Sequence, residues 1–322
     1  MIKQLPPVIF LMGATATGKT GLAIELAGRF PIDIISVDSA MVYRGMDIGS
    51  AKPEAEILAQ APHALVDIRN PEDTYSAANF CKDALGIMQA SWAAGRIPLL
   101  VGGTVLYFNA LEYGLSPLPD ADPVMRKEIE GRAEIEGWPA LHAELRLLDP
   151  LAAERIKTND RQRIQRALEV CQLTGVSMTS LQQQKQSPLQ ARILKLILTA
   201  GDRAILHQRI ESRFEQMLAA GFLDEMKALM ARPGLDKDST VMRSVGYRQG
   251  WEYLEARAAG ERDPDAFQIF RDAVVSATRQ LAKRQLTWLR QIPLCLWYDW
   301  PGAGNSSRII KEVGVFLEMP DE

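Results

Sequence analysis

Two short stretches near the N-terminus carry residue types whose spacing suits catalysis or phosphate binding. GATATGKT, residues 13–20, fits the pattern G-x-x-x-x-G-K-[ST] and lies between an apolar run and a helical pattern. In such a loop the glycines let backbone N–H groups point inward, Lys19 neutralises terminal phosphate oxygens, and the Thr20 hydroxyl can ligate Mg²⁺. The pattern therefore predicts a di- or triphosphate ligand, without specifying ATP or phosphoryl transfer.

Asp38 stands at the end of the next apolar run, IDIISV at 32–37. An acid in that place most often helps to hold a magnesium ion, and its other role is to take a proton from a nucleophile. A third apolar run ends in Gly102, Gly103 and Thr104, which offer a hydroxyl but no acid, and no N-K-x-D guanine motif is found. Asp38 is therefore the one acid at a strand end near the loop, and both roles stay open.

Alternating strands and helices are expected to position these residues. Apolar runs at 7–13, 32–37 and 97–103 are typical of buried strands, and helical spacing follows at 19–30 and 75–95. Repeated βα units predict a parallel sheet. The expected fold class is α/β, with a core like the P-loop-containing nucleoside triphosphate hydrolases, a nucleotide-binding class that includes ATP-binding proteins.

A proline-rich break near residue 118 predicts a second domain. Helical patterns follow it with no strand until 192–200; Asp122 and Pro123 mark one helix start, and Gly175 marks a helix end. We predict a P-loop core domain over residues 1–117 and 191–322, and a helical insertion domain over residues 118–190. Later elements are predicted as helices at 203–221, around 243–254 and at 267–291, a strand at 294–300 and a terminal amphipathic helix.

Composition narrows the class of protein. The 322 residues are 47% hydrophobic with net charge −3, which is ordinary for a soluble globular protein and speaks against a general nucleic-acid binder. The charge is uneven, however, since residues 278–290 carry four basic residues, no acid and Trp288. Such a run is either a solvated helix face or a surface for a phosphate backbone beside an unstacked base.

The chain has no apolar stretch long enough to span a bilayer and no secretory signal pattern. Cys81, Cys171 and Cys295 are odd in number and far apart, which predicts reduced thiols and argues against a zinc site. We therefore expect a cytoplasmic protein that does not associate with membranes.

Taken together, the motifs resemble the bacterial tRNA dimethylallyltransferases, also called tRNA isopentenyltransferases, of the IPP transferase family. They run in order from residue 8 to about residue 290 and comprise GATATGKT, ISVDSAMVYRGMDIGSAKP, APHALVDI, YSAANF, PLLVGGTVLYFNALEYGLSPLP, NDRQRIQRALEV, HQRIESRFEQML, RSVGYRQ and ATRQLAKRQLTWLR. Ala14 departs from the proline that the family commonly has there. The extra zinc finger of eukaryotic relatives is missing.

The resemblance implies a reaction. The dimethylallyl group of dimethylallyl pyrophosphate would pass to the exocyclic N6 amine of adenosine 37, in the anticodon loop of tRNAs reading codons that begin with U, with release of pyrophosphate. It also implies Mg²⁺ as cofactor, the tRNA anticodon stem-loop as partner, and a monomer without an obligate protein partner.

The resemblance also assigns residues. Asp38 is similar to the family's base, since an adenine amine is a weak nucleophile that needs an acceptor for its proton. Thr104 resembles the family residue that makes a polar contact at the mouth of the reaction channel. Arg213 resembles the residue whose positive charge meets the leaving group. His63, in the APH motif, is a loop histidine whose role stays open. The residues that match the pyrophosphate-binding positions are Gly13, Ala14, Thr15, Ala16, Thr17, Gly18, Lys19 and Thr20, with Thr20 as the magnesium ligand.

The tRNA-contacting positions of the family fall on several segments, because the target base must leave its stack while backbone contacts hold the RNA. The matching residues are Asp38, Ser39, Ala40, Met41, Thr104, Arg126, Gln162, Arg163, Ile164, Gln165, Arg166, Arg243, Ser244, Val245, Gly246, Tyr247, Arg248, Lys283, Arg284, Gln285, Trp288 and Arg290.

Three other hypotheses remain. An adenylate isopentenyltransferase would use the same loop and base on a free nucleotide, but would not need the helical insertion or the basic helix formed by residues 278–290. A small-molecule P-loop kinase would use Asp38 as base for a substrate hydroxyl. A non-enzymatic nucleotide-binding module would not require an acid beside the loop.

Overall fold

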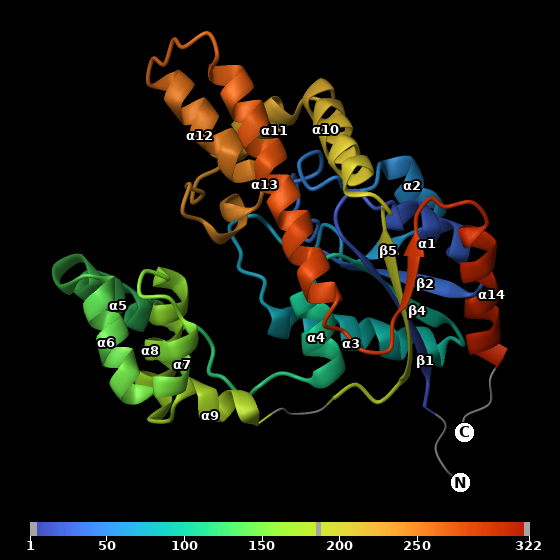
Figure 1. Cartoon of the computed structure of the whole chain (residues 1–322), viewed down its shortest axis with the longest axis horizontal. Helices are drawn as coiled ribbons and strands as arrows, with labels where there is room; N and C mark the ends of the chain where they lie inside the picture. The colour runs from blue at the N-terminus through green and yellow to red at the C-terminus, as the bar shows by residue number, and fades with distance from the viewer. Residues whose placement is uncertain (1–4, 185–187, 319–322) are drawn as a thin grey trace. The chain divides into compact units, whose positions relative to one another are not determined.

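The computed structural model describes residues 5–184 and 188–318, and within them the chain forms two compact units (Figure 1). The first unit comprises residues 1–108 and 190–322, and the second comprises residues 109–189. The predicted domains also include residues 1–4, 185–187 and 319–322, which lie outside the described residues. The division falls earlier in the chain than the proline-rich break near residue 118.

A parallel sheet forms the centre of the first unit. Among the described residues its strands lie in the order β3-β2-β4-β1-β5-β6, and every neighbouring pair is parallel. The predicted α/β class is therefore confirmed. The bounds are β1 Pro7–Gly13, β2 Ile32–Val37, β3 His63–Ala64, β4 Ile97–Gly102, β5 Arg192–Thr199 and β6 Leu296–Asp299.

Helices connect these strands and continue after the sheet. Their bounds are α1 Lys19–Ala27, α2 Ala55–Gln60, α3 Ala77–Ala93, α4 Val105–Tyr113, α10 Arg203–Ala219, α11 Phe222–Met230, the short 3₁₀ helix η1 Thr240–Arg243, α12 Tyr247–Ala258, α13 Ala266–Leu289 and α14 Asn305–Glu318. Within the described ranges, no helix has the length and apolar content needed to cross a bilayer.

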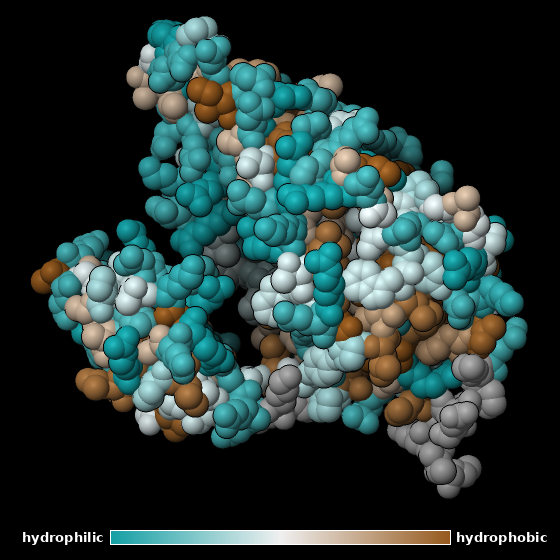
Figure 2. All heavy atoms as spheres, viewed as in Figure 1, coloured by the Kyte–Doolittle hydropathy of each residue, from teal (hydrophilic) through white to brown (hydrophobic). Residues whose placement is uncertain are grey.

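Both faces of the sheet are covered, which explains why the central strands are apolar throughout. On one face, the core includes Leu11 of β1, Leu22 of α1 and Ile309 of α14. On the other face, the rings of Phe10 and Phe108 lie 5.1 Å apart, which joins β1 to α4. Figure 2 shows exposed hydrophobic residues gathered mainly over the region of β6 and α14, while hydrophilic side chains cover the helices α10, α12 and α13.

The second unit is helical in its described part, as the sequence predicts. Its helices are α5 Pro123–Glu136, α6 Trp138–Leu148, α7 Pro150–Arg155, α8 Arg161–Thr174 and α9 Met178–Gln183, and it also contains most of α4. Asp122 caps α5 and Gly175 ends α8 with φ +69°. The Leu189 N–H donates to the Glu112 carbonyl oxygen at 3.1 Å, so the chain enters and leaves this unit at neighbouring points.

Some local predictions were wrong in detail. His63, predicted as a loop residue, begins β3 and pairs with Ile34 of β2. A strand of two residues is too short to leave an alternating pattern in a sequence. The helical segment predicted around 243–254 is interrupted, because Gly246 has φ +90° and separates η1 from α12.

Candidate active site

The predicted phosphate loop connects β1 to the first turn of α1. Gly13 has no room for a side chain, because an added Cβ would lie 2.7 Å from the Leu198 carbonyl oxygen. Gly18 has φ +85°, a left-handed conformation that favours glycine. Lys19 Nζ donates to the Ala14 carbonyl oxygen at 2.6 Å. The backbone thus curls around a lysine at a helix N-terminus, which is the arrangement of an anion-binding loop.

The other loop residues differ in exposure. Ala14 and Thr17 are buried, and Thr17 Oγ1 donates to the Ala14 carbonyl oxygen at 2.8 Å. Thr15, Ala16 and Thr20 are half-buried and line cavities described below. The hydrogen bond between Thr17 and Ala14 stabilises the curled backbone of the loop. Thr15, Ala16 and Thr20 are accessible from the cavities, so their backbone or hydroxyl groups can contact a ligand.

The Lys19 ammonium lies where its charge is disfavoured. Desolvation lowers its pKa to about 7, with a further lowering from the Arg213 guanidinium and partial opposition from Asp38. A bound pyrophosphate would add negative charge and favour the ammonium form. The lysine is therefore suited to gain a proton when an anion binds.

Asp38 follows the last residue of β2. Its Oδ1 accepts the backbone N–H groups of Ala40 at 2.8 Å and Met41 at 3.2 Å. Both bonds use the same oxygen, so the turn fixes the carboxylate and leaves Oδ2 without a hydrogen bond from the described residues. Ser39 is exposed and Ala40 and Met41 are half-buried, so the predicted segment 38–41 reaches the surface of the cavity.

Thr104 lies beside Asp38 because β2 and β4 are neighbours. Val37 pairs with Gly102, and the Thr104 N–H donates to the Val37 carbonyl oxygen at 3.3 Å. An added Cβ on Gly102 would lie 2.0 Å from that same oxygen, so only glycine permits this approach. The two predicted catalytic residues therefore leave adjacent strands at the carboxyl edge of the sheet, where ligands bind in this class of fold.

Arg213 reaches the same edge from α10. Its Nη1 donates to the Thr15 hydroxyl at 3.3 Å. Desolvation lowers its pKa, and Asp38 partly opposes that effect. Arg213 remains charged, so the loop lysine, the arginine and the Asp38 carboxylate form one compact set of charges.

Two cavities meet at these residues. The larger holds about 410 Å³ and the smaller about 220 Å³. Both are lined by Asp38, Arg213, Thr15 and Gly103. The larger cavity continues past Thr104, whereas the smaller one continues along the phosphate loop to Thr20. A ligand that spans the two would place its phosphates by the loop and its reacting atoms between Asp38 and Arg213.

The smaller cavity also has ligands suited to Mg²⁺. Its lining includes the hydroxyl residues Thr20 and Ser36. Mg²⁺ usually takes one or two protein oxygens and completes its shell with water and substrate phosphates. His63 lies there too; its Nδ1 bonds to the Ala61 carbonyl oxygen at 2.7 Å, and burial lowers its pKa, so its buried Nε2 is an acceptor. The residues present therefore fit the ion.

Gln285, predicted to contact tRNA, is bonded to the protein here. Its Oε1 accepts the Thr15 N–H at 2.9 Å, and its Nε2 donates to the Gly103 carbonyl oxygen at 3.0 Å. An added Cβ on Gly103 would lie 2.4 Å from that nitrogen. Its neighbour Arg284 also lines the larger cavity. Lys283, Trp288 and Arg290 of the same basic segment are exposed.

The RSVGYR segment divides at Gly246. Arg243, Ser244, Val245 and Gly246 line the larger cavity. Tyr247 is fully buried instead and donates its hydroxyl to Glu225, while Arg248 is exposed and paired with Glu252. The side chain of Tyr247 is thus turned into the protein rather than toward the cavity.

In the second unit, two predicted arginines share one carboxylate. Arg126 and Arg166 bind the fully buried Glu169, with nitrogen–oxygen distances of 2.9 Å and 2.7 Å. Burial raises the pKa of Glu169, but the hydrogen bonds from Arg126, Arg166 and the Asp122 backbone outweigh it and lower the pKa below its ordinary value. The carboxylate fixes both guanidiniums while part of each stays exposed.

The remaining predicted residues of α8 differ among themselves. Gln162 and Arg163 are exposed, and Arg163 pairs with Asp160 one turn earlier. Gln165 Nε2 donates to the Arg126 carbonyl oxygen at 3.1 Å. Ile164 is fully buried in the core of this unit. The exposed surface of the helix is therefore formed by the polar residues of the set, and the isoleucine packs inside.

Sequence reasoning missed the apolar wall of the larger cavity. On α10 the wall residues are Ile210, Phe214 and Met217, which flank Arg213. Together with Arg213 they have the spacing i, i+3, i+4 and i+7, which puts all four on one helix face, and this pattern is present in the sequence. Gly49 and Ser50 also line the cavity, yet no residue type or periodicity in their loop indicates it.

A phosphate loop after the central strand of a parallel sheet, with a polar site at the carboxyl ends of the strands, defines an α/β protein of the P-loop class. The model of the IPP transferase family matches residues 41–292. The chain is 55% identical over 299 residues to the tRNA dimethylallyltransferase of Thiobacillus denitrificans, covering 93% of this chain and 91% of the relative. The chain belongs to the IPP transferase family.

Two solved structures agree with this result. The tRNA isopentenylpyrophosphate transferase of Bacillus halodurans is similar with a TM-score of 0.69 and 34% identity, covering 97% of each chain. A eukaryotic dimethylallyltransferase acting on tRNA has a TM-score of 0.77 at 23% identity, over 97% of this chain and 79% of that one. The second likeness supports the fold alone.

Proposed function

We propose that this protein transfers the dimethylallyl group of dimethylallyl pyrophosphate to the N6 amine of adenosine 37 in the anticodon loop of tRNA. One observation carries the proposal. Asp38, Arg213 and Thr15 of the phosphate loop line both of two adjacent cavities, and Lys19 of the same loop lines the smaller one. A proton acceptor therefore faces the nucleophile on one side, and cations face a leaving pyrophosphate on the other.

The residues suggest how the step proceeds. The N6 nitrogen forms a bond to C1 of the dimethylallyl group while the bond from C1 to the pyrophosphate oxygen breaks. The amine proton passes to Asp38 Oδ2, because Oδ1 is held by the backbone of Ala40 and Met41. Asp38 then returns the proton to solvent, and pyrophosphate departs with the electron pair of the broken bond.

The leaving group is stabilised by the loop N–H groups, Lys19 and Arg213. Preorganised donors of this kind lower a barrier because they need not reorient as charge develops. When bound to Thr20, Mg²⁺ would neutralise part of the same charge. Thr104, one strand away from the loop, is assigned to hold the amine and pyrophosphate groups in line.

The tRNA is proposed to contact both parts of the chain. In the core domain, the cavity residues 243–246 and 38–41 meet the flipped base, and the exposed residues Lys283, Trp288 and Arg290 meet the RNA near it. In the helical insertion, predicted at 118–190, the arginines on and near α8 hold phosphates. We also propose that the protein acts in the cytoplasm, as a monomer without a partner protein.

A single labelling experiment tests the proposal against its alternatives. Isotopically labelled dimethylallyl pyrophosphate is offered with unmodified tRNA whose anticodon loop has consecutive adenosines, or with AMP, and ATP is offered without a prenyl donor. We expect label in tRNA only. Label in AMP but not in tRNA would identify an adenylate isopentenyltransferase, and ATP turnover without prenyl transfer would identify a kinase.

A further inference from the structure

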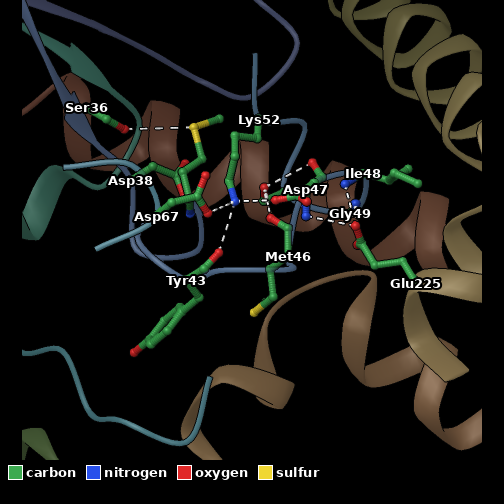
Figure 3. A network of polar contacts seen from close by, with 12 residues as sticks. Ser36, Asp38, Tyr43, Met46, Asp47, Ile48, Gly49, Lys52, Asp67 and Glu225 are labelled. Carbon is green, nitrogen blue, oxygen red and sulfur yellow. Dashed lines mark hydrogen bonds and ion pairs between the residues drawn. The ribbon is translucent and has the colours of Figure 1, made fainter. Parts of the chain in front are cut away.

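Glu225, a residue outside the predicted site, accepts four hydrogen bonds on one carboxylate. Its Oε2 accepts the backbone N–H groups of Asp47 at 2.8 Å and Ile48 at 2.7 Å. Its Oε1 accepts the Gly49 N–H at 3.0 Å and the Tyr247 hydroxyl at 2.7 Å. Figure 3 shows the carboxylate facing the three consecutive backbone groups. The loop therefore binds Glu225 as a backbone nest binds an anion.

Packing restricts the same loop. An added Cβ on Gly49 would lie 2.5 Å from Phe222 Cε2 and 2.6 Å from Tyr247 Cζ. Phe222 and Tyr247 are both buried, with ring centroids 5.6 Å apart at an interplanar angle of 73°. The loop backbone thus lies directly on an aromatic pair from α11 and α12, and position 49 tolerates only glycine.

A second anchor holds the other end of the loop. Lys52 is buried, with 4% of its side chain exposed, and its Nζ donates to the Tyr43 carbonyl oxygen at 3.0 Å. The same nitrogen binds the Asp67 carboxylate at 2.5 Å and also the Asp47 carboxylate (Figure 3). The loop from 47 to 52 is therefore fixed at both ends by charged groups.

The Glu225–Tyr247 bond joins two walls of the larger cavity. Gly49 and Ser50 line that cavity from the loop side, and residues 243–246 line it from the side of α12. Tyr247 is the next residue in the chain, and Glu225 binds its hydroxyl and the loop with the same oxygen. Neither side chain belongs to the cavity lining, so both act through the backbone that they hold.

We propose that Glu225 and Tyr247 are positioning residues for the transfer reaction. They set the separation between the loop at 47–50 and the segment at 243–246, and so hold the acceptor base in line with Asp38. The inference rests on the proposed function. Substitution of either residue should therefore slow the chemical step, while the Tm and the Kd of the prenyl donor change little.

Tyr247→Phe tests the hydroxyl alone, because the ring and its packing stay in place. With both substrates saturating, we expect the single-turnover rate of label transfer to tRNA to fall about tenfold, the effect of roughly one hydrogen bond on a barrier. The Kd of dimethylallyl pyrophosphate should stay within about twofold, since the phosphate loop is not part of this contact. The Tm should change by only a few degrees, about what one lost hydrogen bond costs.

Glu225→Gln tests the acceptor. The amide NH₂ group of the glutamine cannot accept a hydrogen bond and would face N–H donors of the loop. We therefore expect the single-turnover rate of label transfer to tRNA to fall about a hundredfold. Asp224→Asn is the matched control, because Asp224 is the exposed neighbour on α11 and pairs only with Lys227 among the described residues. The control should transfer label at the wild-type rate.

The outcomes separate the inference from the function on which it rests. A slower transfer step with unchanged donor affinity supports the positioning role. An unchanged rate in Tyr247→Phe overturns it, and so does an equal loss of rate and donor affinity. If Glu225→Gln does not fold, Tyr247→Phe alone carries the test. If the wild-type protein transfers no label to tRNA, the proposed function fails instead.

Discussion

Gln285 on α13 accepts the backbone N–H of Thr15 in the phosphate loop at 2.9 Å, across 270 positions of the chain. The other end of the same amide donates to the Gly103 carbonyl oxygen, next to Thr104. One side chain from the basic helix therefore ties the phosphate loop to the strand end of β4. A helix expected to serve RNA binding also maintains the geometry of the phosphate site.

Gln285→Leu should weaken the binding of dimethylallyl pyrophosphate. Leucine has a similar size but leaves the Thr15 N–H without its acceptor, which costs about 1–3 kcal/mol when such a group is buried. Titration calorimetry on the free protein should show a Kd about tenfold higher, with tRNA affinity unchanged. Gln280→Leu, an exposed glutamine on the same helix, is the control. Loss of tRNA affinity with normal donor binding would contradict this prediction and support an RNA contact.

Binding of the donor should be coupled to proton uptake by Lys19. Desolvation, and after it the Arg213 guanidinium, lowers the pKa of Lys19 to about 7. Above that pH the Lys19 amine is therefore neutral in much of the free protein. Because the anion favours the ammonium form, affinity should fall as pH rises through 7, and binding at pH 8 should take up protons. Calorimetry in two buffers of different ionisation enthalpy measures this uptake. Lys19→Arg stays charged and should abolish it; persistent uptake would assign the proton elsewhere.

Asp38→Asn should show whether Asp38 accepts the amine proton or holds a magnesium ion, the two roles that the sequence left open. Asparagine keeps an acceptor for the Ala40 and Met41 N–H groups but cannot accept the amine proton. The single-turnover rate should fall by about 10²–10⁴-fold, the range for a lost general base. Affinities for tRNA and for the donor with Mg²⁺ should stay within about twofold of wild type. A collapse of Mg²⁺-dependent donor binding would identify Asp38 as a metal ligand.

Glu169→Gln should destabilise the protein in a pH-dependent way. Burial raises the pKa of Glu169, but Arg126 and Arg166 lower it below the ordinary value of 4.5. The stabilising contribution is therefore complete above pH 4.5 and is lost as pH falls through the lowered pKa. At pH 7 we expect a loss of about 2 kcal/mol, less than for a fully buried pair because both guanidiniums reach water.

Thermal unfolding from pH 7 down to pH 3 measures this effect. The difference between wild type and Glu169→Gln should shrink as pH falls. Glu134→Gln, an exposed acid on α5, serves as the control and should match wild type throughout. A difference that stays constant across this range would mean that Glu169 acts by packing rather than by charge.

The features predicted best were those encoded in adjacent residues. The phosphate loop needs only the spacing within residues 13–20, and Asp38 is marked by the apolar run before it. By contrast, Glu225 binds the loop at 47–49 from 176 to 178 positions away, and in the sequence it is one acid among many on a helix. Periodicity cannot tell such an acid from a solvated one, because its partners are defined only by the fold.

The glutamine and tyrosine of the RNA-binding motifs illustrate the same limit. Gln285 and Tyr247 are predicted to contact tRNA, yet the fold bonds the first to Thr15 and buries the second against Phe222. A motif marks a position as important but does not say which way its side chain points. Helical spacing can indicate which face of a helix a residue lies on. It cannot indicate what packs against that face, because the contacting residues come from segments distant in the sequence.

The neighbouring ends of the helical unit, joined by the bond from Leu189 to Glu112, determine how the fold can accommodate changes of length there. A module whose two ends meet can be replaced by another of different length without stretching the sheet to which it is attached. An insertion or deletion within the helical unit would therefore leave the phosphate loop, Asp38 and Thr104 in place at the edge of the sheet.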